Sequence, residues 1–152
     1  MTRSGVFRFA FGFGLLELVI ALAVTAILMS IAFPSYRRFV LKSHRVEALQ
    51  ALLELQSAQE RYFVQHNSYA SSLSDPAPNG LGLSALTPGG YYLIQLESDI
   101  ADGAGHFTGR AAARPESKQT EDLSCRSLTV NELGDRHAED SAGLDRSAEC
   151  WR

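Results

Sequence analysis

The feature that most constrains this chain is an apolar run near its N-terminus. From Phe9 to Phe33 the sequence holds 25 residues and a single charged side chain, Glu17. Such a run is long enough to cross a bilayer as a helix, which takes about 20 residues. No second run of this length follows within the 152 residues. The composition therefore excludes a multi-pass membrane protein and leaves room for one small polar domain.

Two simple interpretations explain the apolar run poorly. A secretory signal peptide usually has an apolar core of about 7–15 residues followed by a small-residue cleavage site. Here the run is longer, and it ends in the sequence FPSYRR at residues 33–38. A plain membrane anchor would not be expected to contain Glu17, because inserting a carboxylate into the membrane within an apolar helix costs on the order of 2–4 kcal/mol of free energy.

The carboxylate of Glu17 can avoid that cost in two ways. It stays hydrated if it lies near the membrane interface, or it is neutralised by a positive partner. A cut between Gly12 and Phe13 would create a new α-amine four residues before Glu17. Residues at this spacing lie on one side of a helix. The amine and the carboxylate could then pair within one subunit or between neighbouring subunits of an assembly.

These residues carry a family resemblance. The sequence GFGLLE at residues 12–17, the apolar stretch after it and AFPSY at residues 32–36 resemble the class III signal and N-terminal helix of type IV pilins. The resemblance implies a leader of residues 1–12, a prepilin peptidase that cuts between Gly12 and Phe13, and methylation of Phe13. It also implies that Glu17 guides packing into the filament and that Pro34 bends the helix. The sequence departs from the family's usual pattern at Phe11, Gly14 and Ala26.

Beyond Pro34 the pattern predicts one helix and a small sheet. Apolar residues recur at three- and four-residue spacings, which predicts a helix from Phe13 to about Gln65. Residues 67–90 are rich in Pro, Gly, Asn and Ser, which predicts a long loop. Alternating and β-branched segments then predict three strands, with a turn at residues 103–105 between the first two: Tyr91–Glu97, His106–Ala112 and Ser127–Val130.

This order of elements predicts the fold class and the domains. We expect an α+β protein in which the long N-terminal helix packs on a small antiparallel sheet, the type IV pilin fold. Residues 13–35 would form the transmembrane and filament-core half of the helix. Residues 36–152 would form the globular domain, which ends in a disulfide loop at residues 125–150.

The two cysteines, Cys125 and Cys150, both lie late in the chain. In an exported chain such a pair is typical of one disulfide, although two unrelated thiols are the alternative. The sequence CRSLTVNELG at residues 125–134 and the terminal CWR resemble the C-terminal end of minor pilins of the PilE type. Pilins close this region with a disulfide, which the resemblance therefore implies here.

Signals for catalysis and for bound metals are absent. The four histidines are far apart and match no metal-ligand spacing. The acidic stretch at residues 135–145 lacks the alternating ligands and closing Glu of a calcium loop. No nucleophile motif is present. We therefore expect no enzymatic activity, no cofactor and no metal.

Three basic residues, Arg110, Arg114 and Lys118, are candidates for contact with nucleic acid. Some minor pilins bind DNA during uptake with basic residues on the sheet and in the disulfide loop. Phosphate binding needs clustered positive charge, whereas the net charge of this chain is -3. A solvated strand edge explains the three residues more simply, and this argues against DNA as a partner.

The resemblance predicts a minor pilin of a type IV pilus. We expect assembly or initiation of the filament, with roles in twitching motility and adhesion. The alternatives are a type II secretion pseudopilin or a major pilin, and a receptor pilin for DNA uptake. The expected partners are other major and minor pilins, the prepilin peptidase, the inner-membrane assembly platform, and the membrane itself through Phe13–Phe33.

The sequence bears on orientation in two opposing ways. Basic residues are more frequent after the apolar run than before it, which alone favours a cytoplasmic C-terminal part. The cysteines and the resemblance favour export. We expect a single-pass protein of the bacterial inner membrane with a periplasmic C-terminus, which moves to the cell-surface pilus on assembly.

Overall fold

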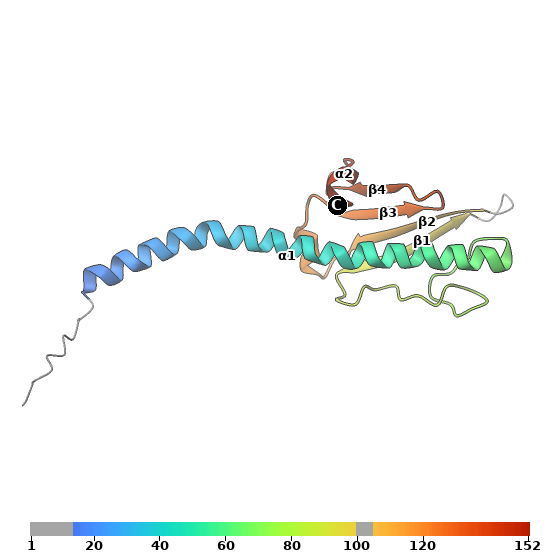
Figure 1. Ribbon diagram of the computed structural model, residues 1–152, viewed down its shortest axis with the longest axis horizontal. Coiled ribbons are helices and arrows are strands. Elements are labelled where there is room, and N and C mark those ends of the chain that lie inside the picture. Colours follow the sequence, from blue (N-terminus) through green and yellow to red (C-terminus); the bar gives the residue numbers. More distant parts are fainter. Residues whose placement is uncertain (1–13, 100–104) are drawn as a thin grey trace, which may run out of the picture. The chain divides into compact units, whose positions relative to one another are not determined.

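The computed structural model describes residues 14–99 and 105–152 (Figure 1). Gly12 and Phe13, where cleavage and methylation are expected, lie outside the described residues, as does part of the turn at residues 103–105. The elements in chain order are α1 (Leu15–His66), β1 (Tyr92–Asp99), β2 (His106–Ala113), the 3-10 helix η1 (Lys118–Glu121), β3 (Ser127–Asn131), β4 (Arg136–Glu139) and α2 (Ser147–Cys150).

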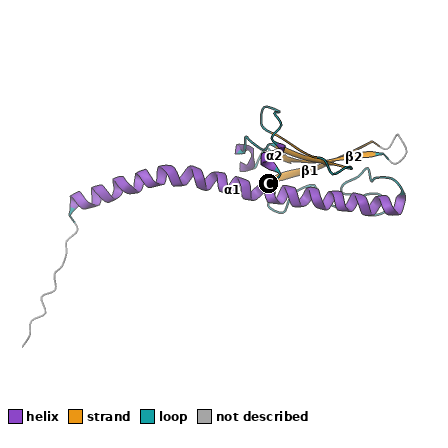
Figure 2. Cartoon of the chain, turned by 45° about the horizontal axis from the view of Figure 1, so that its top comes forward, coloured by secondary structure: helices purple, strands orange, loops and turns teal. Residues whose placement is uncertain are grey.

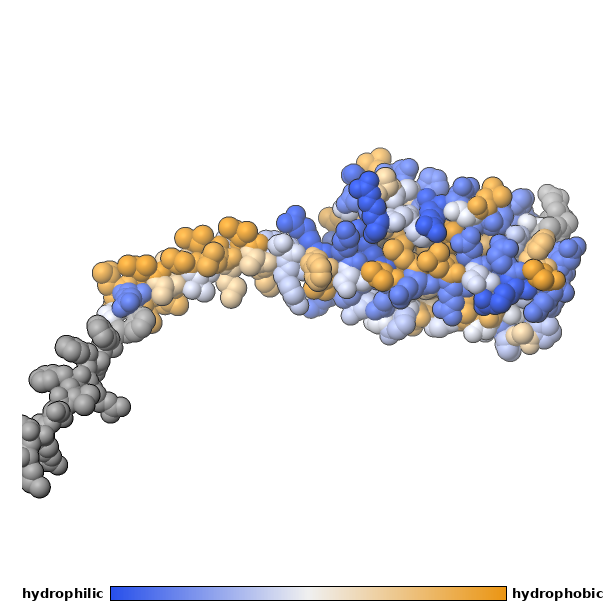
Figure 3. Space-filling model, in the orientation of Figure 1, coloured by the Kyte–Doolittle hydropathy of each residue, from blue (hydrophilic) through white to orange (hydrophobic). Residues whose placement is uncertain are grey.

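Helix α1 belongs to both of the compact units into which the chain divides, Met1–Arg37 and Arg38–Arg152. It is 52 residues long and continues through Pro34, which cannot donate a backbone hydrogen bond. In the first unit its apolar side chains are exposed, and Figure 3 shows this part as an almost continuous hydrophobic surface. One 18-residue stretch of α1 has a mean hydropathy of 2.5, enough in length and composition to cross a membrane.

The four strands form one antiparallel sheet in the order β1-β2-β3-β4. The register pairs Ile94 with Ala111 between β1 and β2, and Ala111 with Leu128 between β2 and β3. Within the second unit, α1 runs along one face of this sheet (Figures 1 and 2). The predicted fold, a long helix on a small antiparallel sheet, is thereby confirmed.

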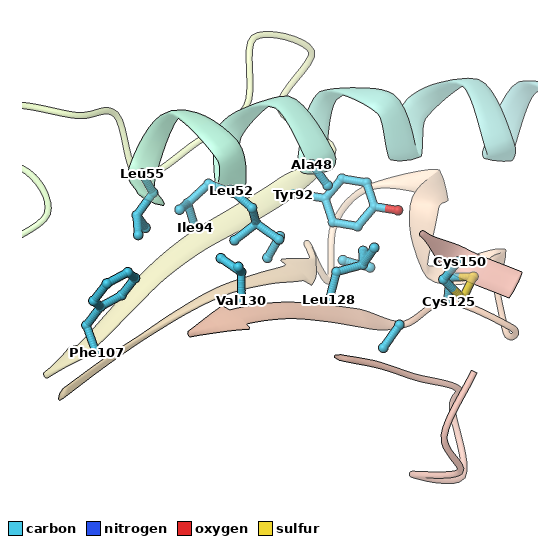
Figure 4. Packing of buried hydrophobic residues seen from close by; sticks show 13 residues of the cluster. Ala48, Leu52, Leu55, Tyr92, Ile94, Phe107, Cys125, Leu128, Val130 and Cys150 are labelled. Carbon is cyan, nitrogen blue, oxygen red and sulfur yellow. A yellow bond between two sulfur atoms is a disulfide. The ribbon is translucent and has the colours of Figure 1, made fainter. Parts of the chain in front are cut away.

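The core of the second unit lies between α1 and the sheet. Ala48, Leu52 and Leu55 project from the helix toward Tyr92 and Ile94 and their neighbours on the sheet (Figure 4). This burial stabilises the unit by about 25 cal/mol for each Å² of apolar surface removed from water. Leu52 and Leu55 are fully buried.

Gly109 in β2 leaves room for side chains of α1 to pack on the sheet. A Cβ atom at this position would come within 2.9 Å of a methyl carbon of Leu55. Real Cβ atoms do not approach other atoms so closely, so a side chain here would force the Leu55 side chain to move. The glycine therefore belongs to the packing of the core.

A disulfide between Cys125 and Cys150 closes the C-terminal region, with 5.8 Å between the two Cα atoms. Both cysteines are buried at the end of the core. The bond ties the segment before β3 to α2 and encloses β4. The C-terminal disulfide loop of the predicted fold is present.

Three elements were not predicted: η1, α2 and β4. Residues 125–150 were expected to form a disulfide loop, but within this segment Arg136–Glu139 pair with β3 as a fourth strand. The strand has only four residues and buries only Ala138, so its alternation is too short to be read from sequence. On the edge of β4 that faces away from β3, the backbone amide of Ala138 donates a hydrogen bond to the Ser147 hydroxyl.

Candidate nucleic-acid interface

The sheet has a polar face opposite the helix. Along β2, buried residues such as Phe107 and Ala111 alternate with less buried ones such as Thr108 and Arg110. Successive side chains of a strand point to opposite faces, so the second set lies on the face that α1 does not cover. This is the face that sequence reasoning had treated as a solvated edge.

One residue from each strand forms a row across this outer face. The register pairs Gln95 with Arg110, Arg110 with Thr129, and Thr129 with His137. Paired residues of antiparallel strands share a face and lie about 5 Å apart. Gln95 and His137 are exposed, whereas Arg110 and Thr129 are half-buried. We call these four residues the cross-strand row.

Arg110, near the middle of the row, has an unsatisfied polar atom. Its Nε is shielded from solvent and has no hydrogen-bond partner in the described chain. Such an atom costs free energy unless a ligand or water reaches it. A guanidinium with spare donors is a good partner for phosphate or for the edge of a guanine base.

The neighbours of the row limit what it can bind. Glu97, Thr108 and Asn131 share the outer face on one side of the row, and Ala112, Ser127 and Glu139 share it on the other. Thr108 and Asn131 can donate and accept hydrogen bonds. Ser127 is buried, Ala112 has no polar side-chain atom, and the two carboxylates repel phosphate. A nucleic acid on this face would have to place its phosphates near Arg110 and away from Glu97 and Glu139.

The three basic residues predicted as candidates do not form one cluster. Arg110 lies in β2, and Lys118 opens η1 and is exposed. Arg114 follows β2, and its Nε donates to Glu116 at 2.9 Å. This ion pair partly neutralises Arg114, and the hydrogen bond from the Arg114 side chain is the main reason that the pKa of Glu116 is lowered.

Arg136 in β4 is a further basic residue, but it pairs with the buried Val130 and so does not share the outer face with the cross-strand row. The guanidinium of Arg136 lies 5.2 Å from the centre of the Trp151 ring, a cation–π contact. The indole Nε1 of Trp151 donates to the His137 carbonyl oxygen at 2.9 Å. This hydrogen bond holds the Trp151 ring against β4. The residue of this strand that belongs to the row and that sequence reasoning missed is His137, which follows the turn at Gly134.

A buried polar network holds η1 against α1. The Gln119 side chain is fully buried, and its Nε2 lies 2.8 Å from the Tyr92 hydroxyl and 3.2 Å from the Leu41 carbonyl oxygen. Burial, and secondarily the nearby carboxylate of Asp122, raises the pKa of the Tyr92 hydroxyl far above its usual value. Tyr92 therefore stays neutral. Because Gln119 follows Lys118 in η1, the same network positions the backbone of Lys118.

The remaining predicted residues lie in α1. Glu17 occupies the first turn of the described helix and is exposed, and Pro34 lies inside it. A negative charge in the first turn interacts favourably with the helix dipole. Among residues 14–99 and 105–152, no group of three or more His, Cys, Asp or Glu side chains converges as a metal site would require.

A long apolar helix that continues onto an antiparallel sheet, closed by a C-terminal disulfide, defines a type IV pilin. Residues 34–129, more than half of the chain, match the sequence model of a family described as "Type IV minor pilin ComP, DNA uptake sequence receptor". Residues 8–33 match the prokaryotic N-terminal methylation motif. The chain therefore belongs to this family of type IV minor pilins, and the predicted class is confirmed.

Solved structures and curated proteins add little to this identification. A type IV pilin from Shewanella oneidensis, known at high resolution, is 22% identical over 63% of this chain and 89% of its own, with a TM-score of 0.45. No match was found among curated proteins. Pilins of this family are structural, non-catalytic proteins.

Proposed function

We propose that this minor pilin is a receptor for double-stranded DNA during uptake. The observation that carries the proposal is the family match, which spans residues 34–129 and so includes β1, β2, η1 and most of β3. The DNA-uptake alternative, which the charge balance had disfavoured, thus becomes the first choice. The pseudopilin and major-pilin alternatives receive no support from this match.

The outer sheet face supports the same proposal through its chemistry. The Nε of Arg110 is a donor that no described residue uses, and Thr129 and His137 are its neighbours in the cross-strand row. The net charge of -3 belongs to the whole chain, whereas the carboxylates beside the cross-strand row on this face are Glu97 and Glu139. Asp122 and Asp140 are held in ion pairs by Arg45 and Arg146, respectively. We assign Arg110 as the central DNA contact, with Lys118 as a phosphate contact at the end of the sheet.

The test is DNA binding by the full chain in detergent, measured by gel shift over a range of salt concentrations. Each phosphate contact adds about 0.9 to the slope of log affinity against log salt. We expect Arg110→Gln to lower affinity several-fold and the slope by about 1. The matched control is Arg61→Gln on α1, where the side chain is exposed and donates a hydrogen bond to Ser57.

Two outcomes would count against this assignment. Absence of binding by the wild type at low salt would overturn the receptor function. Binding that is unchanged in Arg110→Gln would leave the receptor function standing and move the interface away from the cross-strand row.

We also propose that the chain enters a filament by the usual pilin route. The match of residues 8–33 to the methylation motif supports cleavage between Gly12 and Phe13 and methylation of Phe13. Before assembly the protein would be held in the inner membrane by residues 13–33, with its C-terminal unit in the periplasm. Its partners would be the prepilin peptidase, the assembly platform and other pilins, which Glu17 would engage through a neighbour's new amine.

The N-terminal peptide of the protein from its own membranes tests this route. A peptide that starts at Phe13 and carries one added methyl group would support it. An N-terminus at Met1 would contradict processing, and a start beyond Phe33 would indicate an ordinary signal peptide. Roles in filament initiation, twitching motility and adhesion rest on the resemblance alone and stay predictions.

A further inference from the structure

A charged pocket opens in the second unit where α1 begins to contact the rest of that unit. Its volume is about 390 Å³, which falls within the range of roughly 300–1,000 Å³ typical of small-molecule sites. One wall is the first part of α1 in this unit, with Arg38, Leu41 and Lys42. The other wall comes from the end of η1, the segment after it, and α2, with Leu123 and Glu149 among its residues.

The walls of the pocket carry opposite charges. Arg45 and Asp122 also line it, but they form an ion pair with each other and so hold the two walls together. Arg38 and Lys42 on α1 have no ion pair with any described residue, and neither has Glu149 on α2. A ligand that fills this pocket should therefore carry an anionic group and a cationic group, separated by a short neutral linker.

Few residues separate the basic wall from the apolar run in the sequence. The run ends at Phe33, and Arg38, the first residue of the second unit, follows five residues later. The headgroup layer of a bilayer is roughly 5–8 Å thick on each side. Tyr36, exposed between these two positions, is of the type that collects at this interface. The long side chains of Arg38 and Lys42 can therefore meet lipid phosphates.

From the opposite charges of the two walls, and from the nearness of the basic wall to the apolar run, we propose that the pocket binds the headgroup of an aminophospholipid. Phosphatidylethanolamine is a lipid of this chemical class. The phosphate would lie between Arg38 and Lys42, and the primary ammonium would face Glu149. The exposed side chain of Leu123 would contact the glycerol carbons. Such a contact would orient the subunit on the membrane before it enters a filament.

The inference rests on the membrane anchoring in the proposed function, and its test separates the two. The full chain is reconstituted into lipid discs that contain equal parts of phosphatidylethanolamine, phosphatidylcholine and phosphatidylglycerol. It is then extracted in mild detergent, and the retained lipids are measured by mass spectrometry. Failure to insert would contradict the anchoring. Insertion without lipid preference would overturn only the pocket assignment.

We expect phosphatidylethanolamine to be enriched roughly threefold over the other two lipids, the scale of one exposed ion pair. Glu149→Gln should abolish this preference while leaving total lipid retention unchanged. Lys42→Gln should lower retention of all three lipids by up to about fivefold, the scale of one basic residue at a lipid surface. The matched controls are Glu54→Gln and Arg61→Gln, both exposed on α1 and outside the pocket.

Three results would overturn the inference. The first is a preference for phosphatidylglycerol that Glu149→Gln leaves unchanged, because it would indicate a purely anionic ligand. The second is micromolar binding of soluble glycerophosphoethanolamine, which would make a free metabolite the ligand. The third is equal retention of all lipids combined with failure of Lys42→Gln to enter filaments, which would assign the pocket to a contact with another pilin.

Discussion

Arg45 on α1 and Asp122 after η1 form a two-pronged ion pair inside the globular unit. The Arg45 Nη2 lies 2.8 Å from Oδ1 of Asp122, and its Nε lies 2.5 Å from Oδ2. The side chains are only 13% and 3% exposed, respectively. The pair joins residues 77 positions apart in sequence and fastens the segment between β2 and β3 to the helix.

Arg45→Met should destabilise the unit strongly, because it leaves the Asp122 carboxylate buried without its counter-ion. Loss of one partner of a buried pair typically costs about 3–5 kcal/mol. The measurement is urea denaturation of the full chain in detergent, monitored through the fluorescence of Trp151. Arg61→Met, at an exposed position of the same helix, serves as the control.

The double variant Arg45→Met/Asp122→Leu distinguishes the pair from a mere packing effect. Replacement of both charges by apolar side chains should recover much of the lost free energy of unfolding. A double variant less stable than Arg45→Met would contradict this account.

The disulfide between Cys125 and Cys150 should contribute about 3.5 kcal/mol by restricting the unfolded chain across a loop of this length. We expect the variant with both cysteines replaced by serine to unfold at correspondingly lower urea. Reduction of the wild type should give the same shift, and the reductant should leave the variant unaffected. A disulfide of no structural importance would give equal midpoints for the oxidised and reduced wild type.

Asp140 organises the turn before α2. Its carboxylate accepts hydrogen bonds from the amides of Leu144 and Ala142, at 3.0 and 2.8 Å, and from Arg146. The amides of Leu144 and Ala142, in that order, are the main reason that the pKa of Asp140 is lowered. The pKa of Asp140 in the folded state therefore lies below its unfolded-state value of about 3.9. The stabilisation that the ionised carboxylate gives to the folded state is complete above the unfolded-state pKa and is lost as the pH falls through the folded-state pKa.

Amide hydrogen exchange tests the turn directly. Protection at Ala142 and Leu144 should hold from pH 7 down to about pH 4 and decline below it. Asp140→Asn should weaken this protection at neutral pH and remove its acid dependence. Protection that stays constant in the wild type through pH 2 would show that the Asp140 carboxylate does not hold the turn.

Glu17→Ala should block entry into the filament without unfolding the globular unit, because Glu17 lies in the other compact unit. The variant should accumulate in the membrane with wild-type urea stability and be missing from sheared filaments. Val24→Ala, at another exposed position of the same apolar segment, is the control. Normal incorporation of Glu17→Ala would remove the role that the resemblance assigns to this residue.

Local patterns were sufficient to predict much of this fold. The spacing of apolar residues indicated α1 to within two residues of its ends, and alternation indicated β1, β2 and β3 to within about the same margin. The four residues of β4 bury only one side chain, so no local pattern marks them. The link between Arg45 and Asp122 depends on the tertiary arrangement, because neither residue carries a local sign of its partner.

The candidate interface shows the same limit. Sequence grouped Arg110, Arg114 and Lys118 by their closeness in the chain, whereas the sheet groups Arg110 with Gln95, Thr129 and His137 through strand register. Register follows from how the whole sheet packs on α1, and Gly109 contributes by allowing Leu55 to approach β2. The neighbours of a basic residue such as Arg110 are therefore set by strand register, and counting charges along the sequence does not reveal these neighbours.

We proposed above that this pilin is a receptor for DNA, and the family that it matches is described as a receptor for a DNA uptake sequence. The most direct measurement is selection of fragments of the bacterium's own genomic DNA by the purified full chain at moderate salt, followed by sequencing. The account predicts enrichment of fragments that share a short sequence, with the enrichment reduced in Arg110→Gln. Recovery of fragments in proportion to their abundance, together with no gel shift at low salt, would contradict it.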